Sequence, residues 1–358
     1  MRVIQVIDSL HAGGAERLAV NCANAMTKEV DKSFLCTTRE EGALKETLFD
    51  NVTYLFLNKK RTLDIYAIKK FINFLKENKI DIVHAHATSY FFTFLAKLLY
   101  PRFKLIWHDH YGNSEYIDKR KVFFLKLASL KFDGIISVNT ILSAWAKKKL
   151  HCTNVIYLPN FAILNENETH ETSLGGVDGK RIVCLANLRA QKDHITLLKA
   201  FELLLNDYPE WTLHLVGKDF NDDYSAQVKK MIKKEGLSDR VFFYGSRKDT
   251  AHILSQSTIG LLSSKSEGLP VSLLEYGLAE LAVVCTDVGQ CSDVISNSEY
   301  GNLIPPKNTK ALIGALIELI KNEDLRKLKA KKLALKIQQE YSLEKRIRDL
   351  VSFYETIR

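Results

Sequence analysis

Two glutamates, Glu267 and Glu275, flank a Gly-Leu-Pro turn and could bind the hydroxyl groups of a ligand that also carries phosphate. The turn follows the apolar run 259–262, which predicts a buried strand, and precedes apolar residues at helical spacing. Pro270 suits the first helical position because it has no N–H to leave unpaired. The free N–H groups and the dipole of a helix start favour phosphate, whereas carboxylates accept strong hydrogen bonds from sugar hydroxyls. This combination is typical of a nucleotide-sugar site, although two solvated glutamates at a helix end would give the same spacing.

The same stretch resembles a known family motif. Glu267 to Pro270, with Glu275 eight residues after Glu267, is similar to the E-x7-E motif of the GT4 family of retaining glycosyltransferases, which have the GT-B fold. The resemblance implies that Glu267 faces the donor sugar in the reaction centre and that Glu275 binds the ribose. It also implies that the turn between them contacts the nucleotide-sugar through Gly268, Leu269, Pro270 and Val271.

A glycine pair provides a second candidate phosphate contact. Gly13 and Gly14 lie between the predicted strand 3–7 and a predicted helix, an arrangement in which backbone N–H groups approach phosphate closely. The alternative is a tight turn that needs glycine only for its φ angle. The absence of G-x-G-x-x-G argues against a nicotinamide dinucleotide. The resemblance implies that Gly13 and Gly14 belong to the loop that closes over the donor diphosphate.

Basic residues follow the predicted strand 181–186, which is where a diphosphate needs charge to offset its own. Arg189 and Lys192 lie on this loop, and a solvated basic loop is the alternative. Lys192 matches the lysine of the GT4 family. The family arginine directly follows a glycine, and Asn187 stands at that position, so Arg189 is the candidate to replace it.

Histidines end two further predicted strands. His86 follows the strand 82–86, and His108 and His110 follow the strand 104–107, at the carboxyl ends where ligands gather in parallel sheets. The resemblance implies that His108 lies by the donor sugar and reaction centre, with His110 as the alternative and His86 as a wall of the acceptor cleft. We expect no metal here, because Asp109 between two histidines is not a recognised ligand spacing.

Strand and helix patterns alternate along the chain, which predicts an α/β protein with doubly wound, mostly parallel sheets. The resemblance implies the GT-B fold, with two Rossmann-like domains facing a central cleft and a last helix that crosses back to the first domain. We assign residues 1–163 to an N-terminal acceptor-binding domain and 164–180 to a polar linker. Residues 181–341 form a C-terminal nucleotide-sugar-binding domain, and 342–358 form the crossover helix.

The composition of the chain indicates in which compartment the protein works and what it can bind. The 358 residues carry six cysteines without C-x2-C pairs, which indicates reduced core thiols in a cytoplasmic protein. We expect no signal peptide and no membrane span. The net charge of +9 fits phosphorylated substrates or an anionic membrane surface, and the chain has no nucleic-acid-binding pattern. The apolar helix 90–99 is expected to be buried, whereas the basic, aromatic stretch 115–131 fits either a helix at the inner face of the membrane or a solvated one.

The resemblance to the GT4 family implies a retaining, metal-independent glycosyltransferase without a cofactor. It would move a hexose from a UDP- or GDP-sugar to a hydroxyl of a glycan or lipid-linked glycan, in surface polysaccharide or glycolipid biosynthesis. Glu267 and His108 would orient the donor rather than attack it. The alternatives are a nucleotide-sugar epimerase on the same fold and a non-catalytic subunit that binds nucleotide-sugar.

Overall fold

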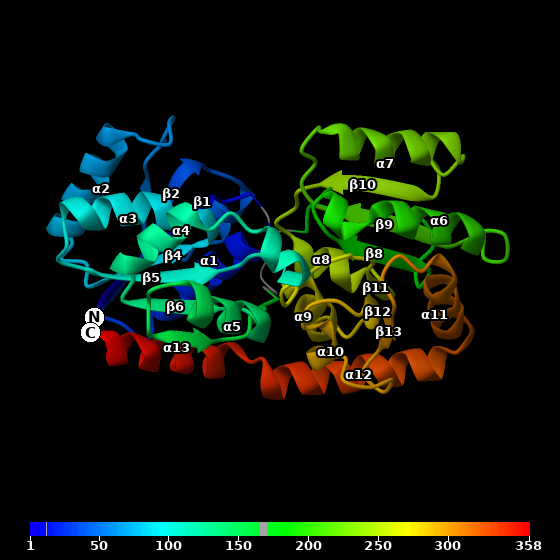
Figure 1. Ribbon diagram of the computed structural model, residues 1–358. Coiled ribbons are helices and arrows are strands. Elements are labelled where there is room, and N and C mark those ends of the chain that lie inside the picture. Colours follow the sequence, from blue (N-terminus) through cyan, green and yellow to red (C-terminus); the bar gives the residue numbers. More distant parts are fainter. Residues whose placement is uncertain (12, 113, 165–169) are drawn as a thin grey trace. The chain divides into compact units, whose positions relative to one another are not determined.

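The computed structural model describes residues 1–11, 13–112, 114–164 and 170–358, which form two compact units (Figure 1). The first unit comprises Met1–Phe161 and Leu343–Arg358, and the second comprises Ala162–Ser342. The expected linker 164–180 falls within the range of the second unit, and its residues 165–169 lie outside the described part of the chain.

The first unit is built on a seven-stranded parallel sheet in the order β3-β2-β1-β4-β5-β6-β7. Its strands are β1 Arg2–Ser9, β2 Lys32–Glu40, β3 Thr53–Phe56, β4 Ile82–His86, β5 Lys104–Asp109, β6 Gly134–Ser137 and β7 Val155–Tyr157. Strands β1 and β4 are neighbours although two strands separate them in sequence. That reversal of strand order is the topological switch point, where such sheets bind ligands at their carboxyl ends.

Helices and short 3₁₀ turns connect these strands. They are α1 Gly14–Met26, η1 Ala43–Thr47, α2 Ile65–Glu77, η2 Ala87–Ser89, α3 Tyr90–Leu99, η3 Ser114–Lys119, α4 Phe123–Ala128, η4 Ser129–Lys131 and α5 Thr140–Lys149. The helix expected at 90–99 is present as α3. Phe92, Phe94 and Ala96 are buried in the core as predicted, whereas Leu98 and Leu99 at its end are exposed. The stretch 115–131 is not one helix, because η3, α4 and η4 divide it.

The C-terminal helix α13 (Leu343–Ile357) belongs to the first unit, as the GT-B resemblance implied. Its buried residues recur at helical spacing, from Ile347 and Leu350 to Phe353, Tyr354 and Ile357. Gly134 of β6 permits this packing, because a Cβ atom there would lie 2.7 Å from the ring of Phe353.

The second unit contains a six-stranded parallel sheet in the order β10-β9-β8-β11-β12-β13. Its strands are β8 Arg181–Leu185, β9 Thr212–Val216, β10 Val241–Gly245, β11 Ile259–Leu262, β12 Ala282–Thr286 and β13 Asn302–Ile304. Its helices are η5 Ala190–Lys192, α6 His194–Leu204, α7 Asp223–Lys234, α8 Thr250–Ser255, α9 Val271–Leu278, α10 Cys291–Val294, α11 Thr309–Lys321 and α12 Glu323–Glu340. The switch point of this sheet lies between β8 and β11.

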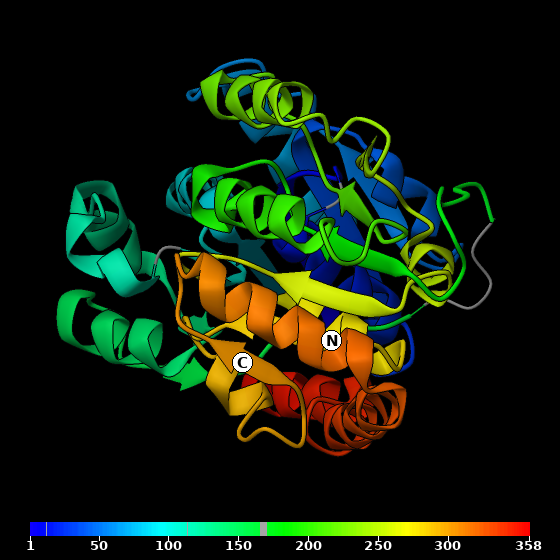
Figure 2. The ribbon, with the colours of Figure 1, turned by 90° about the vertical axis from the view of Figure 1, so that its right-hand side faces the viewer.

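Alternating side chains cover the two faces of the second sheet. Ile182 and Cys184 of β8 pack in the cluster that includes the apolar residues of α6 and α11, and Figure 2 shows these two helices side by side. Val183 and Leu185 pack in the cluster on the opposite face, with α9 and α12. The α/β fold with two doubly wound, parallel sheets predicted from the sequence is therefore confirmed.

All six cysteines are buried and free, as predicted. Among the helices of the described residues, none combines the length and the apolar run required to span a bilayer.

Candidate active site

Tyr276 of α9 fixes the helix against the switch point of the second unit. Its hydroxyl accepts a hydrogen bond from Leu185 N (2.6 Å) and donates one to Leu261 O (3.2 Å), so it bridges β8 and β11. Gly260 makes room for the ring, because a Cβ atom at this position would lie 2.5 Å from it. The helix that carries Glu275 is thereby tied to both strands that end at the candidate site.

Lys192 and Glu267 meet at this switch point. Lys192 follows β8 and Glu267 follows β11, and Lys192 Nζ lies 2.5 Å from Glu267 Oε1. Ser264 Oγ donates to the same carboxylate oxygen at 2.6 Å. Glu267 and Glu275 are only 5% and 4% exposed, so the alternative of two solvated helix-end glutamates is wrong.

The turn after Glu267 is held by the loop that follows β12. Gln290 N donates to Gly268 O at 2.9 Å. Gly289 has φ +58°, and a Cβ atom there would lie 2.4 Å from the carbonyl oxygens of Glu267 and Gly268, so only glycine fits. Sequence analysis missed Gly289 and Gln290 as supports of the turn. A glycine after a predicted strand was visible, but its contact with residues 267–268 was not.

The helix after the turn starts one residue later than expected. Pro270 is the N-cap of α9, with φ −71° and ψ 122°, and Val271 is the first helical residue. Leu269, Pro270 and Val271 are buried with the turn. Proline has no side-chain oxygen to cap the first turn of α9, which is the end of a helix that favours an anion.

Arg189 does not join the ion pair of Lys192 and Glu267. It is exposed, and its guanidinium carbon lies 4.7 Å from the centre of the Phe220 ring. Asn187, at the position of the family arginine, accepts a hydrogen bond from Lys218 N at 2.7 Å and so connects the loops after β8 and β9. Arg189 as the replacement for the family arginine therefore stays a prediction.

In the first unit, Gly13 and Gly14 lie at the start of α1, as predicted. Gly13 is the N-cap and accepts a hydrogen bond from Arg17 N at 2.9 Å, and Gly14 is the first helical residue. Gly13 has φ −156°, an extended conformation open to any residue. Its φ angle therefore does not require glycine, contrary to the alternative explanation for this turn.

The histidines of β4 and β5 gather into one buried cluster. His86 and His108 are register partners at the carboxyl ends of the two strands. His84 Nε2 lies 3.2 Å from His108 Nδ1, and His86 Nδ1 lies 3.1 Å from His110 Nε2. The ring of His84 stacks on that of His86 at 4.4 Å, and the rings of His108 and His110 lie 4.1 Å apart.

Burial keeps these four imidazoles neutral. It lowers the pKa of His84 and of His110 to about 3, and it lowers the pKa of His86 and His108 well below the usual value. His84 was missed in the sequence analysis. The alternation His84-x-His86 was its signal, because residues two apart on a strand point to the same face.

Metal ligation is the other chemistry available to such a cluster. Within the described ranges, His84, His86 and His108 offer ring nitrogens that all lie within 4.8 Å of one another, and imidazole is a common ligand of transition metals. Asp109 lies between His108 and His110 in the sequence, but its carboxylate binds Arg120, which donates to its two oxygens at 2.6 and 2.9 Å. The expectation that this histidine cluster binds no metal stays a prediction.

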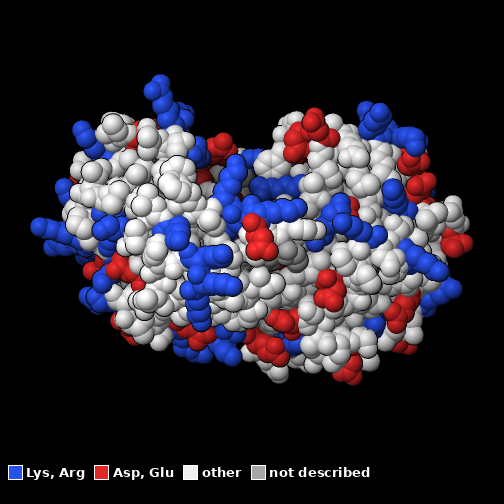
Figure 3. Space-filling model, in the orientation of Figure 1, with Lys and Arg blue, Asp and Glu red and all other residues white. Residues whose placement is uncertain are grey.

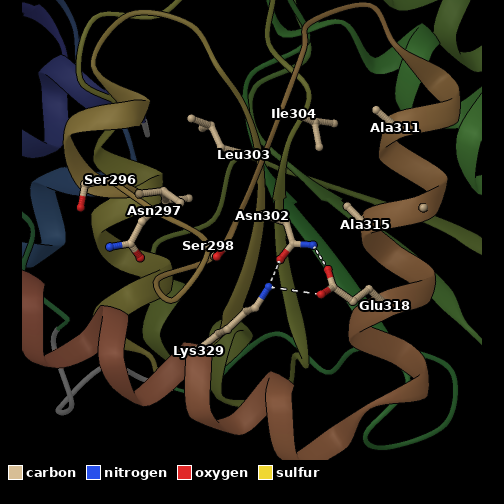
Figure 4. Close-up of a pocket in the computed structure, with 13 residues that line it drawn as sticks. Ser296, Asn297, Ser298, Asn302, Leu303, Ile304, Ala311, Ala315, Glu318 and Lys329 are labelled. Carbon is tan, nitrogen blue, oxygen red and sulfur yellow. Dashed lines mark hydrogen bonds and ion pairs between the residues drawn. The ribbon is translucent and has the colours of Figure 1, made fainter.

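A pocket of about 430 Å³ lies elsewhere in the second unit, and none of the predicted site residues lines it (Figure 4). Lys329 Nζ donates to Asn302 Oδ1 at 2.6 Å and lies 3.6 Å from a carboxylate oxygen of Glu318. The lysine charge in this pocket is therefore already balanced by the protein.

Sequence comparisons identify both halves of the chain. The family model described as Glycosyltransferase Family 4 matches residues 12–162, and the model described as Glycosyl transferases group 1 matches residues 166–335.

Similar proteins cover nearly the whole chain. An uncharacterized glycosyltransferase of Haemophilus influenzae is 26% identical over 94% of this chain and 95% of its own. The UDP-Gal:alpha-D-GlcNAc-diphosphoundecaprenol alpha-1,3-galactosyltransferase of Escherichia coli is 23% identical over 95% of this chain and 93% of its own. The structure of Anabaena Alr3699/HepE in complex with UDP and glucose superposes with a TM-score of 0.82 at 17% identity, covering 99% of this chain and 100% of the other. The protein is therefore a glycosyltransferase of the GT4 family, with the GT-B fold.

Proposed function

We propose that the protein is a retaining, metal-independent hexosyltransferase that moves a hexose from a UDP- or GDP-sugar to a hydroxyl of a glycan or lipid-linked glycan. The observation that carries this proposal is the partly buried ion pair of Lys192 and Glu267 at the switch point of the second unit. The names of two similar proteins support the substrate class. The E. coli relative is a galactosyltransferase acting from UDP-Gal on a diphosphoundecaprenol-linked sugar, and the Anabaena structure contains UDP and glucose. The pathway would be surface polysaccharide or glycolipid assembly in the cytoplasm.

The proposed mechanism relies on orientation and charge. Lys192 and the start of α9 stabilise the leaving diphosphate, with Gly13 and Gly14 as further phosphate contacts. Glu267 and His108 hold the donor sugar, and Glu275 binds the ribose. The acceptor hydroxyl attacks the anomeric carbon on the face that the diphosphate leaves, and a phosphate oxygen takes its proton. No covalent intermediate with the protein is needed.

A panel of UDP-, GDP- and ADP-sugars tested for thermal stabilisation of the pure protein identifies the donor. The binding donor is then incubated with and without glycan acceptors, and the release of free nucleotide is measured. Release that depends on acceptor supports transfer and excludes an epimerase. Binding without release for any acceptor would instead favour the non-catalytic subunit.

Glu275→Gln should weaken donor binding by roughly 1.5–3 kcal/mol, which is tenfold to more than a hundredfold, because an ionised hydrogen-bond acceptor becomes neutral. Isothermal titration with the nucleotide alone measures this loss. Glu280→Gln is the matched control, since Glu280 is exposed just after the same helix. Parental nucleotide affinity in Glu275→Gln would refute the ribose assignment.

We also propose that the first unit docks on an anionic membrane. Figure 3 shows basic side chains at several places on the face drawn, so charge alone does not single out a docking surface. Around α4, however, exposed lysines lie beside exposed apolar side chains. The lysines are Lys119, Lys121, Lys126 and Lys131, and the apolar residues are Phe123 (76% exposed), Phe124 (58%), Leu127 (48%) and Leu130 (58%). This combination is typical of a membrane-interface segment.

One residue of the basic triplet 119–121 is not part of this surface. Arg120 turns inward, pairs with the buried Asp109 and lies against the rings of Trp107 and Trp145. Arg120 is therefore a structural residue, and a test of membrane binding has to leave it in place.

The variant Lys119/Lys121/Lys126→Ser should weaken co-sedimentation with anionic vesicles at least tenfold, since each basic residue near such a surface contributes about 1 kcal/mol. Binding by the parent should also decrease at high salt. Lys147/Lys148/Lys149→Ser is the matched control, because it removes the same charge from exposed positions of α5. Equal sedimentation of all three proteins, or of none, would indicate a soluble acceptor.

A further inference from the structure

Six polar side chains form one hydrogen-bonded network inside the first unit, which we call the histidine relay. They come from β1, β4, β5, the residue after β5, and α13, and they are Gln5, His84, His86, His108, His110 and Tyr354. All except His110 are at least 98% buried. Polar groups so deep in a protein are costly unless they are paired, so the direction of each hydrogen bond matters.

The Gln5 amide sets the direction of one branch. Gln5 Oε1 lies 2.8 Å from His86 Nε2, and a carbonyl oxygen only accepts, so His86 carries its proton on Nε2. His86 Nδ1 is then an acceptor, and His110 Nε2 donates to it at 3.1 Å.

The amide nitrogen of Gln5 determines the direction of the hydrogen bonds in the second branch of the network. Gln5 Nε2 only donates, and it does so to the Tyr354 hydroxyl oxygen at 3.4 Å. The Tyr354 proton is therefore donated to His84 Nδ1, 2.6 Å away. Because the neutral His84 ring has a single proton, that proton lies on Nε2 and is donated to His108 Nδ1 at 3.2 Å.

The second branch ends at His108. Since Nδ1 of the neutral ring accepts from His84, the proton of His108 has to lie on Nε2. This nitrogen is buried and has no hydrogen-bond partner among the described residues, although His108 stands at the carboxyl end of β5 beside the switch point of the sheet. An unpaired buried N–H indicates a place for a ligand atom that accepts a hydrogen bond.

We propose that Gln5, Tyr354 and His84 are positioning residues that hold His108 as the Nε2–H tautomer, so that His108 donates a hydrogen bond to an oxygen of the sugar donor. The inference rests on the proposed function for the identity of that ligand. It assigns a part in donor recognition to α13, through Tyr354. The hydrogen bonds of the network can also run in the opposite direction. If the oxygen and nitrogen of the Gln5 amide exchange places, every donor in the network becomes an acceptor, and His108 Nε2 then accepts a hydrogen bond instead of donating one.

The tautomer is measured on the full chain with ¹⁵N-labelled histidine, because long-range ¹H–¹⁵N spectra show which ring nitrogen is protonated. His108→Gln identifies the signals of His108. We expect a proton on Nε2 of His84 and His108 in the parent protein. A proton on Nδ1 of His108 in the parent protein would overturn the relay.

Tyr354→Phe should then reduce the Nε2–H population of His108 and lower kcat/KM for the donor about tenfold, with the KM of the acceptor unchanged. Tyr54→Phe is the matched control, because the Tyr54 hydroxyl is hydrogen-bonded to Thr37 Oγ1 at 2.5 Å and lies outside the histidine cluster. An unchanged His108 tautomer in Tyr354→Phe would overturn the proposal. So would stoichiometric binding of Zn²⁺ that shifts the four histidine signals, since the cluster would then be a metal centre.

The two proposals fail separately. If no nucleotide-sugar and acceptor give turnover, the proposed function fails, whereas the tautomer measurement still decides the relay. If transfer occurs and His108 is protonated on Nδ1, the relay alone is wrong.

Discussion

Lys192→Ala is expected to slow sugar transfer roughly 30- to 1,000-fold, which corresponds to about 2–4 kcal/mol of transition-state stabilisation. Charge develops on the diphosphate as the sugar leaves, and Lys192 is the cation that lies at the switch point of the second unit beside Glu267. Single-turnover rates at saturating donor measure the effect on the chemical step itself.

The variant should also lose some stability. From the sequence alone, Lys192 was expected to face a ligand rather than the core, so that its removal would lower turnover far more than stability. In the structure it neutralises Glu267, whose side chain is only 7% exposed, and its loss leaves a buried carboxylate without its cation. The slower rate therefore has to be measured on protein that is folded at the assay temperature.

Lys265→Ala is the matched control for this change. Lys265 pairs with the buried Asp193 at 2.9 Å, so its removal also leaves a buried carboxylate without its cation, beside the same two loops. We expect lower stability in both variants and a large rate loss only in Lys192→Ala. Equal rates in the two would refute the role of Lys192. Arg189→Ala, assayed in parallel, shows whether Arg189 replaces the family arginine.

Features set by local sequence were predictable. The alternation of strand and helix patterns predicted the two parallel sheets. The positions of the turns were predicted from glycines, from Pro270 and from the ends of the apolar runs. Glu267 and Lys192 were identified separately as site residues, each on its own loop. Their contact joins residues 75 apart through the pairing of β8 with β11, which no local pattern contains.

Features set by tertiary contacts were not predictable. Gln5 and Tyr354 are hydrogen-bonded across 349 residues, and each alone looks like an ordinary polar residue in an apolar element. Arg120 lies in the basic stretch 115–131, which was expected at a membrane surface or in solvent, and this was wrong for Arg120 because it pairs with the buried Asp109. Sequence shows that three basic residues are adjacent, but only the fold determines which of them meets a carboxylate.

The first unit is expected to lose stability steeply as the pH falls below about 6.5, the usual pKa of histidine in an unfolded chain. Burial lowers the pKa of His84 and of His110 to about 3, and it lowers the pKa of His86 and His108 well below the usual value. The unfolded chain therefore binds protons that the folded chain cannot. The stability is fully present above pH 6.5 and is lost as the pH falls toward the folded pKa values. Each histidine contributes up to about 1.4 kcal/mol per pH unit, so the four give on the order of 5–6 kcal/mol per unit.

Urea unfolding of the Trp211→Phe variant at several pH values between 7.5 and 5 measures this slope for the first unit. The remaining tryptophans, Trp107 and Trp145, both lie in that unit, so their fluorescence reports on it alone. His84→Gln in the same background is the control and should lower the slope by about 1.4 kcal/mol per pH unit, because one proton fewer is taken up on unfolding. A free energy of unfolding that stays constant from pH 7 to 5.5 would mean that the histidines take up protons equally in the folded and the unfolded protein, so that their pKa values are not lowered by folding. The direction of the relay would then hold only above the ordinary pKa of histidine, where each ring carries a single proton.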